Sequence, residues 1–157
     1  MSPRQKYMEL AVGLATQNVL SGAGGPFGAV VVKDDEVVAA CANSVTATND
    51  PTAHAEINAI RAACKALNSF QLDGCDFYTS CEPCPMCMAA LYWARPAAVY
   101  YANTHADAAQ AGFDDSFIYT ELALPPQERK LPVLRLSDPG AIESFQQWMS
   151  IQNKVKY

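Results

Sequence analysis

The sequence predicts a three-layer α/β/α domain in which helices cover both faces of a central mixed five-stranded sheet. After an initial pair of strands, strand-like and helix-like patterns alternate along the chain, which is typical of a layered α/β domain. The chain has 157 residues, the length of one domain, and a chain of this size buries roughly 70% of its unfolded surface without disulfides. Its residues are 50% hydrophobic and 17% charged, as in a folded globular protein. We therefore expect residues 1–157 to form a single domain.

The N-terminal part of the chain predicts a helix followed by a hairpin of two strands. Apolar residues recur at helical spacing between residues 7 and 15, and the glycines and the proline of residues 21–28 end that helix. Residues 27–33 have the continuous apolar pattern of a buried strand. Residues 34–36 predict a turn, and residues 37–43 predict the second strand of the hairpin.

The middle of the chain alternates helix and strand. Residues 44–51 are polar and predict a loop, whereas residues 53–67 carry apolar positions at helical spacing. Residues 75–80 predict a strand. Pro85 suits the first turn of a helix that ends before Arg95, and residues 97–102 predict the next strand.

The C-terminal part predicts two helices, a long loop and the fifth strand. Residues 105–110 predict a short helix. Residues 111–130 are irregular in pattern, and a loop of that length inside a compact domain is often functional. Residues 131–136 predict the fifth strand, and residues 140–156 predict a final helix with a basic end.

The charge and the apolar pattern argue against two classes of partner. The net charge of −5, the pI of about 4.9 and only 11 Lys and Arg residues lower the expectation of a nucleic-acid partner. No apolar run approaches the roughly 20 residues that span a bilayer, and the N-terminus lacks the pattern of a signal peptide. We therefore expect a cytoplasmic protein that binds no membrane. In that reducing compartment, six cysteines indicate metal ligands, catalytic groups or buried apolar residues before disulfides.

One cluster of residue types indicates a catalytic zinc site. Cys84 and Cys87 lie three residues apart at the start of a predicted helix, where the helix dipole favours thiolates on one face. His54 begins another predicted helix and offers an imidazole, so the three side chains supply three zinc ligands and leave a fourth position for water. Zinc lowers the pKa of a bound water to about 7. Glu56, two residues after His54, is placed to move the protons of that water.

The same residues allow other interpretations when they are taken one at a time. Cys84 and Cys87 alone also fit a redox pair or two buried thiols. With Cys81 they also fit a closed structural site of three cysteines and one histidine, as in a non-catalytic zinc-binding module. An iron–sulfur site needs a fourth cysteine at suitable spacing, and Cys75 lies within a predicted strand. Since Cys81 ends a strand while Cys84 opens a helix, we expect Cys81 near the metal but not bound to it.

Several segments of the chain match one known family. The H-A-E of residues 54–56 followed by the P-C-P-M-C of residues 83–87 fits the zinc-deaminase signature H-x-E…P-C-x-x-C. On these residues the chain resembles the cytidine-deaminase superfamily. Within it the chain is most similar to the bacterial guanine deaminases, and the resemblance covers nearly the whole chain. The matching segments are GGPFGAVVVK, NDPTAHAE, TSCEPCPMC, YWARP, AGFDDSFIY and the C-terminal Tyr157.

The resemblance implies hydrolytic deamination of guanine to xanthine and ammonia. It implies one Zn²⁺ per subunit, held by His54, Cys84 and Cys87, with Glu56 as the catalytic proton carrier. Deamination of cytosine, a nucleoside, an aminotriazine or a tRNA adenosine is the alternative that keeps the same chemistry. A free base is small and neutral, so the acidic pI does not disfavour it as substrate.

The resemblance also implies a set of substrate contacts. Asn43 and the backbone of Ala55 would hydrogen-bond the base, and Phe27 and Trp93 would line its pocket. Without the resemblance, Asn43 also fits a turn after its strand, and both aromatic residues equally fit the core.

The last implications concern the C-terminal half and the assembly. Asp115 would contact the leaving amino group as a second catalytic proton carrier, although the neighbouring Asp114 is an alternative. The subunits would pair as a homodimer. The segment of about residues 138–157 either stays with its own subunit or is exchanged, and exchange would place Tyr157 over the neighbour's site.

Overall fold

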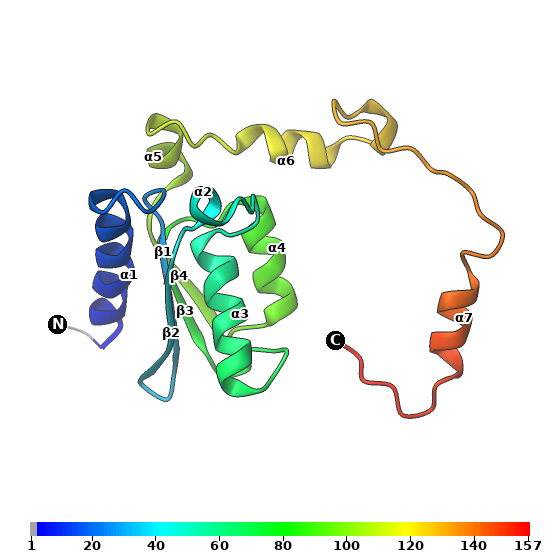
Figure 1. The fold of residues 1–157 in the computed structure, drawn as a ribbon, viewed down its shortest axis with the longest axis horizontal. Helices are drawn as coiled ribbons and strands as arrows, with labels where there is room; N and C mark the ends of the chain where they lie inside the picture. Colours follow the sequence, from blue (N-terminus) through cyan, green and yellow to red (C-terminus); the bar gives the residue numbers. More distant parts are fainter. Residues whose placement is uncertain (1–2) are drawn as a thin grey trace. The chain divides into compact units, whose positions relative to one another are not determined.

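The computed structural model describes residues 3–157 of the chain (Figure 1). These residues form two compact units, one that ends at Ser116 and one from Phe117 to Tyr157. The first unit contains the sheet and the predicted metal ligands. No helix among the described residues has the combination of length and apolar character that crossing a bilayer demands.

A mixed sheet forms the centre of the first unit. Its strands are β1 (Gly28–Lys33), β2 (Glu36–Ala42), β3 (Asp76–Cys81) and β4 (Ala98–Asn103), in the spatial order β2-β1-β3-β4. β1 pairs antiparallel with both β2 and β3, whereas β3 pairs parallel with β4. The sequence therefore predicted the mixed α/β sheet correctly.

The hairpin and the first strand follow the predicted pattern. Asp34 and Asp35 connect β1 to β2 with φ angles of 50° and 62°, the positive values that a two-residue hairpin turn uses. β1 is buried along almost its whole length, which explains why it lacks the polar alternation of a half-exposed strand.

The prediction of a fifth strand is wrong. Within residues 3–157 the sheet has four strands, and residues 131–136 pair with none of them. The apolar side chains of this segment are exposed, and Leu136 is 96% accessible. An apolar segment forms a strand only where a partner strand supplies hydrogen bonds, and Pro132 removes one donor from residues 131–136.

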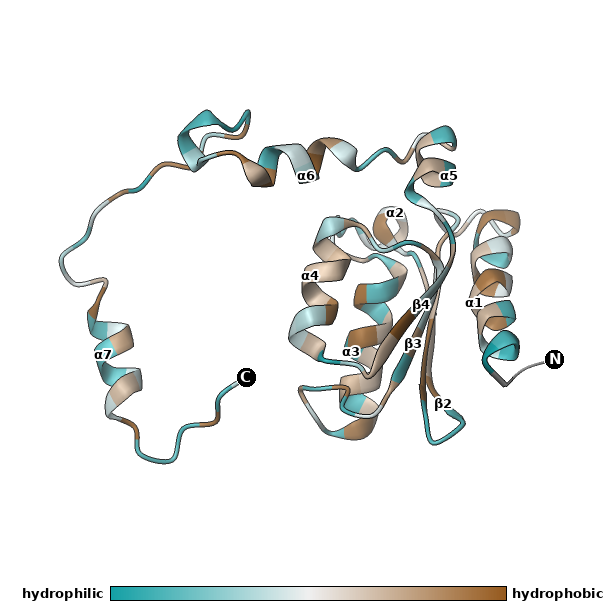
Figure 2. Ribbon diagram, turned by 180° about the vertical axis from the view of Figure 1, so that it is seen from behind, coloured by the Kyte–Doolittle hydropathy of each residue, from teal (hydrophilic) through white to brown (hydrophobic). Residues whose placement is uncertain are grey.

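Three longer helices complete the layers of the first unit. α1 (Pro3–Leu20) packs on one face of the sheet, while α3 (Ala55–Leu67) and α4 (Pro85–Ala94) pack on the other. Two apolar clusters fill the two interfaces. On the α1 side the cluster consists of Tyr7, Ala11, Val30, Val32 and Tyr78. On the other side it consists of Ala29, Val31, Ala39, Ala55, Ala59, Ala63, Leu72, Cys75, Phe77, Leu91 and Ala94. Figure 2 shows this apolar character along the strands and the facing helices.

Gly28 allows α1 to lie close to the sheet. A Cβ atom at this position would be 2.3 Å from the carbonyl oxygen of Ala11 and 2.9 Å from the backbone nitrogen of Ala15. Both atoms belong to the backbone of α1, so they cannot move aside as a side chain can. A glycine is therefore required by the close approach of helix and strand.

Two segments predicted as loops contain short helices. The predicted loop of residues 44–51 includes α2 (Val45–Thr48). The predicted irregular segment of residues 111–130 includes α6 (Ser116–Ala123) and a single 3₁₀ turn, η1 (Pro126–Glu128). The short helix α5 (His105–Gln110) agrees with the prediction.

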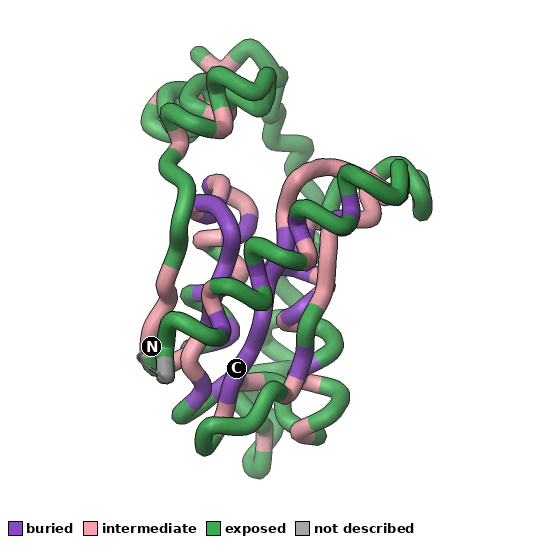
Figure 3. The backbone as a smooth tube through the Cα atoms, turned by 90° about the vertical axis from the view of Figure 1, so that its left-hand side faces the viewer, coloured by how far each residue is buried: buried purple, intermediate pink, exposed green. Residues whose placement is uncertain are grey.

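The second unit has little apolar core of its own. Its helix α7 (Glu143–Ser150) is shorter than the predicted helix over residues 140–156. No residue from 117 to 157 is buried; Figure 3 draws buried residues in purple and exposed ones in green. Large apolar side chains such as Leu134, Phe145 and Tyr157 are exposed.

Candidate metal centre and active site

The starts of two helices position the predicted metal ligands. His54 and Cys84 occupy the N-cap positions of α3 and α4, with extended backbone angles (φ −65°, ψ 156° and φ −64°, ψ 166°). Neither side chain caps its own helix, so each is available to a ligand. Pro85 is the first residue of α4, and Cys87 lies one turn into that helix. Both helices thus direct their positive ends towards the same point.

The three ligand atoms have the spacing of a zinc site. His54 Nδ1 lies 3.6 Å from Cys84 Sγ and 3.5 Å from Cys87 Sγ. All three ligand atoms lie within 4.8 Å of one another. In an ideal tetrahedral zinc site, a nitrogen at about 2.0 Å and a sulfur at about 2.3 Å from the metal are about 3.5 Å apart. The residues present therefore fit zinc, and three protein ligands leave the fourth position open.

The ionisation of the cluster also suits a cation. Hydrogen bonds from the Cys87 thiol and from His54 lower the pKa of Cys84 to about 4. The Cys87 pKa is raised, because its thiol donates to Cys84 and because it is buried. The hydrogen bond to Cys84 raises the pKa of His54 despite its partial burial. The cluster thus holds a thiolate among donors, an arrangement in which a metal cation replaces the protons.

Glu56 lies in the first turn of α3 beside this cluster. Only 4% of its surface is exposed, and Oε1 accepts a hydrogen bond of 3.3 Å from Thr79 Oγ1 on β3. Burial raises the pKa of Glu56, and the negative charge of Cys84 acts in the same direction. A carboxyl group with a raised pKa beside a metal site is suited to accept and return a proton near neutral pH.

Cys81 is not part of the cluster of three ligand atoms. It is the last residue of β3, and its thiol donates to the backbone oxygen of Thr104 at a sulfur–oxygen distance of 3.7 Å. Among the described residues, the group of side chains able to hold a metal comprises His54, Cys84 and Cys87 without Cys81. The expectation that Cys81 lies near the metal but not on it agrees with this geometry.

The loop after β2 lies against the start of α3. The backbone N–H of Ser44 donates to the carbonyl of Ala53 at 3.0 Å, and the Asn58 side chain donates to Ala53, Ala42 and Ser44. These bonds bring Asn43 close to the predicted metal site.

Asn43 is itself held from several sides. Its side-chain Oδ1 accepts from the Val45 N–H at 3.2 Å, as in the turn that the sequence left open for it. Its backbone N–H donates to the carbonyl of Phe27 at 3.0 Å. Its backbone oxygen accepts from Asn18 Nδ2 at 2.9 Å. Asn43 and Phe27 therefore belong to one fixed group.

Phe27 contacts the segment that carries the two aspartates. Its ring makes an edge-to-face contact with the ring of Phe113, with centroids 5.0 Å apart and planes at 85°. Phe113 immediately precedes Asp114 and Asp115. One end of the first unit therefore gathers Phe27, Asn43 and the aspartate segment.

Two predicted pocket residues are exposed. Trp93 on α4 is 64% exposed, and it follows Cys87 by six residues, which places it on a different face of the helix at 100° per residue. Tyr157 belongs to the second unit and is 73% exposed. Their proposed contacts with substrate stay predictions.

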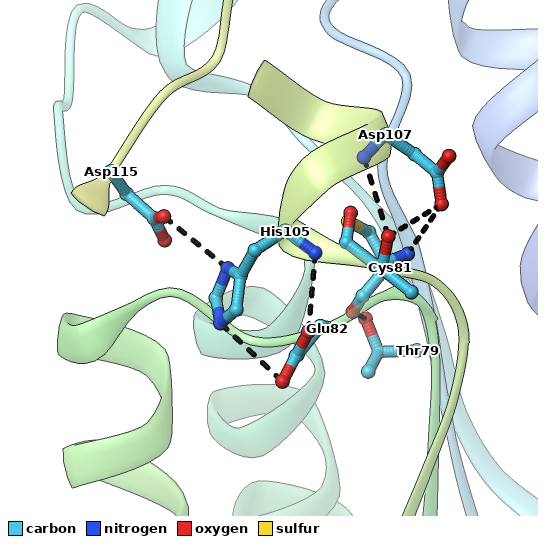
Figure 4. A network of polar contacts seen from close by, with 7 residues as sticks. Thr79, Cys81, Glu82, His105, Asp107 and Asp115 are labelled. Carbon is cyan, nitrogen blue, oxygen red and sulfur yellow. Dashed lines mark hydrogen bonds and ion pairs between the residues drawn. The ribbon is translucent and has the colours of Figure 1, made fainter. Parts of the chain in front are cut away.

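The two neighbouring aspartates have different partners. Asp114 Oδ1 accepts from the Ser116 N–H at 2.9 Å and so occupies the start of α6. Hydrogen bonds from the Ser116 side chain and from its backbone lower the pKa of Asp114. Asp115 Oδ1 instead lies 3.2 Å from His105 Nδ1, and Figure 4 shows its carboxylate directed at the imidazole.

Sequence reasoning missed Glu82 and His105. The backbone N–H of His105 donates to Glu82 Oε2 at 3.1 Å, and His105 Nε2 lies 3.5 Å from Glu82 Oε1 (Figure 4). The sequence marked His105 only as a helix start. The position of Glu82 between Cys81 and Cys84 was the one local signal that this residue has a further role.

Comparison with known proteins gives a family and several relatives. Residues 1–103 match the model of the cytidine and deoxycytidylate deaminase zinc-binding region. The guanine deaminase of Bacillus subtilis is 54% identical over 153 residues, which cover 98% of each chain. The crystal structure of the Bacillus subtilis guanine deaminase matches this structure with a TM-score of 0.95, again over 98% of each chain.

Two further relatives match a smaller part of the chain. A solved guanine deaminase from Nitrosomonas europaea is 34% identical and has a TM-score of 0.65, covering 69% of this chain and 63% of its own. The tRNA-specific adenosine deaminase of Agrobacterium fabrum is 44% identical over 101 residues, which cover 64% of this chain and 66% of the relative.

Proposed function

Because the chain belongs to the cytidine and deoxycytidylate deaminase family, we propose that it hydrolyses guanine to xanthine and ammonia with the help of one zinc ion per subunit. The observation that carries the proposal is the cluster of His54, Cys84 and Cys87 beside the buried Glu56. It occurs in a chain that is similar to a guanine deaminase over 98% of its length.

The chemistry follows from the residue types at the site. Zinc, when bound, supplies a water whose pKa is lowered to about 7. Glu56 accepts a proton at its carboxylate and donates it to a ring nitrogen of the base, which makes the amino-bearing carbon more electrophilic. Asp115 carries the proton that converts the amino group into a leaving ammonia. One water is consumed, and one xanthine and one ammonia form.

Other residues would bind and orient the base. Asn43 can donate and accept through one amide, which suits a base edge with both kinds of group. The backbone N–H of Ala55 supplies a further donor, and the ring of Phe27 offers a face for stacking. Trp93 and Tyr157 would close the pocket from the remaining sides.

A tRNA adenosine is the second candidate substrate beside guanine. The similarity to a tRNA-specific adenosine deaminase favours a tRNA adenosine as an alternative. Two observations weigh against it. That match covers 64% of the chain rather than 98%, and the net charge is −5, whereas binding a polyphosphate is aided by basic residues.

A substrate panel tests the proposal. Zinc-loaded protein is assayed for ammonia release from guanine, guanosine, adenine, cytosine, an aminotriazine and a tRNA anticodon stem, with E56Q as the matched inactive control. We expect the highest kcat/KM for guanine and none for E56Q. A higher kcat/KM for any other compound would overturn the choice of guanine, and activity in E56Q would overturn the proton-carrying role.

We also propose a homodimer in which residues 138–157 are exchanged. Residues 117–157 contain no buried residue and expose apolar side chains, so a second surface is needed to cover them. If Tyr157 completes the neighbour's site, mixing E56Q with Y157A subunits regenerates one intact site per mixed dimer and restores activity. Without exchange, every site in a mixed dimer keeps one defect and activity stays absent.

A cytoplasmic location remains part of the proposal. All six cysteines are free thiols in the structure, as expected of a protein from a reducing compartment.

A further inference from the structure

A line of polar contacts connects the end of β3 to the segment before α6. Glu82 follows β3, His105 is the first residue of α5, and Asp115 directly precedes α6. The imidazole of His105 lies between the two carboxylates, 3.5 Å from Glu82 and 3.2 Å from Asp115 (Figure 4). All three residues lie in the first unit, so their contacts do not depend on the placement of the second.

The parallel pairing of β3 and β4 fixes the backbone directly before His105. Cys81 pairs with Asn103, and the N–H of Glu82 donates to the Asn103 carbonyl at 2.8 Å. The Cys81 thiol donates to the Thr104 carbonyl. This contact gives Cys81 a structural role at the start of α5.

A capping box also fixes the start of α5. Thr104 Oγ1 accepts from the Asp107 N–H at 3.3 Å, and Asp107 Oδ2 accepts from the Thr104 N–H at 2.8 Å. Two backbone N–H groups at the start of α5 are therefore satisfied, and the backbone around His105 is held in place.

We propose that Glu82 and His105 are positioning residues that hold the Asp115 carboxylate in the orientation needed for proton transfer to the leaving amine. The inference rests on the proposed function, in which Asp115 carries that proton. Each nitrogen of the His105 ring faces one of the two carboxylates, so the ring is held from both sides. Glu82 then fixes the ring, and the ring fixes Asp115, in the way that a third group orients a catalytic pair.

Burial and local geometry favour this role over that of an ordinary surface ion pair. Exposed pairs contribute little because each side chain must be immobilised in water. Here the Asp115 side chain is only 18% exposed and those of His105 and Glu82 are 31% exposed. Asp114 is bonded to the start of α6, so it does not compete for His105. Phe113, two residues before Asp115, packs on Phe27, which is predicted to line the pocket for the base. This contact places residues 113–115 beside that pocket.

Variants of His105 test the proposal through kcat. H105A should lower kcat on guanine by about 10-fold to 100-fold with less than about threefold change in KM, because the carboxylate is misplaced while the base still binds. H105N keeps a donor near the Nδ1 position and should recover most of kcat, whereas H105Q keeps a donor near Nε2 and should not. Q110A, an exposed change in the same helix, is the matched control. Wild-type kcat in H105A, or equal kcat in H105N and H105A, would overturn the proposal.

A double-variant comparison asks whether His105 acts through Asp115. In a D115A background, the further change H105A should reduce kcat by less than about twofold, since the carboxylate to be positioned is already absent. A full second loss would overturn the proposal. If wild-type protein releases no ammonia from guanine, the proposed function has failed instead. An NMR measurement of the His105 ring, described next, then tests the positioning contact alone.

Imidazole NMR reports on the contact without activity. The chain has only two histidines, so the ¹⁵N spectrum of the zinc-loaded protein contains one ring for His54 and one for His105. D115A should shift Nδ1 of His105 more than Nε2, and E82A should shift Nε2 more than Nδ1. Shifts no larger than those in Q110A would show that the ring does not connect the two carboxylates and would overturn the proposal.

Discussion

Replacement of Cys81 by alanine separates an open three-ligand site from a closed four-ligand site. The thiol of Cys81 is bonded to Thr104 rather than directed at the ligand cluster. C81A should therefore remove a packing contact and one weak hydrogen bond while the zinc content stays at one ion per chain.

The expected loss of stability is small. Truncating a buried side chain by one heavy atom costs about 1 kcal/mol, and a weak S–H···O bond adds about 0.5–1 kcal/mol. A total of about 1.5–2 kcal/mol lowers Tm by about 3–8 °C in a chain of this length. A lost zinc ligand would cost far more, because structural zinc binds with about 10–16 kcal/mol.

The assay combines metal analysis with chelator competition. The zinc-to-protein ratio and the zinc affinity of C81A should match those of wild type within about threefold. C64A is the matched control for the loss of a thiol outside the site, and C84A should lose zinc, since its sulfur belongs to the ligand cluster. A zinc ratio for C81A as low as that of C84A would refute the three-ligand geometry.

Three further predictions follow from the same structure. E56Q should retain zinc and release no detectable ammonia, a loss of about 10⁴-fold in kcat, measured by metal analysis and ammonia release; full turnover would contradict the role of Glu56. Burial raises the pKa of Glu56 above its ordinary 4.5, so its ionisation opposes folding. Metal-free wild type should thus lose stability relative to metal-free E56Q as the pH rises above about 4.5, and urea unfolding that shows a constant difference would contradict this. G28A should lower stability by about 2–4 kcal/mol because its Cβ meets the backbone of α1, whereas G13A, with no atom within 4 Å, should not, and thermal melts of both variants check this.

The placement of the predicted metal ligands at the starts of two helices could be predicted from the sequence because local signals fix it. Pro85 marks the start of α4, and the helical pattern after His54 marks the start of α3. Helix starts are set by a few neighbouring residues, so the relative directions of Cys84 and Cys87 follow from their spacing alone. The approach of His54 to these thiols came from the family resemblance, because no local rule brings residues thirty positions apart together.

The wrong predictions concern segments whose structure depends on contacts with other residues. Residues 131–136 have a strand-like apolar pattern, but a strand forms only against another strand, and none among the described residues is available to them. The helix α6 was missed because the glycine and aspartates of residues 112–115 resemble a loop. The bond from the Ser116 N–H to Asp114 is a capping signal that could have marked its start.

The contacts of Glu82 and His105 could not be predicted because a parallel strand pair creates them. The two residues are 23 positions apart, and only the register of β3 against β4, with Cys81 opposite Asn103, brings them together. Separately, each has the pattern of an ordinary polar residue at the end of an element.

Zinc-dependent hydrolysis of guanine is tested most directly by ammonia release from one preparation, measured as purified with full zinc, after removal of the metal by a chelator, and after zinc is restored. We predict release in the first state, none in the second, and recovery in the third, with no release by zinc-loaded E56Q at any stage. No release from guanine at full zinc occupancy would contradict guanine as the substrate. Release that survives removal of the metal would contradict the role of zinc.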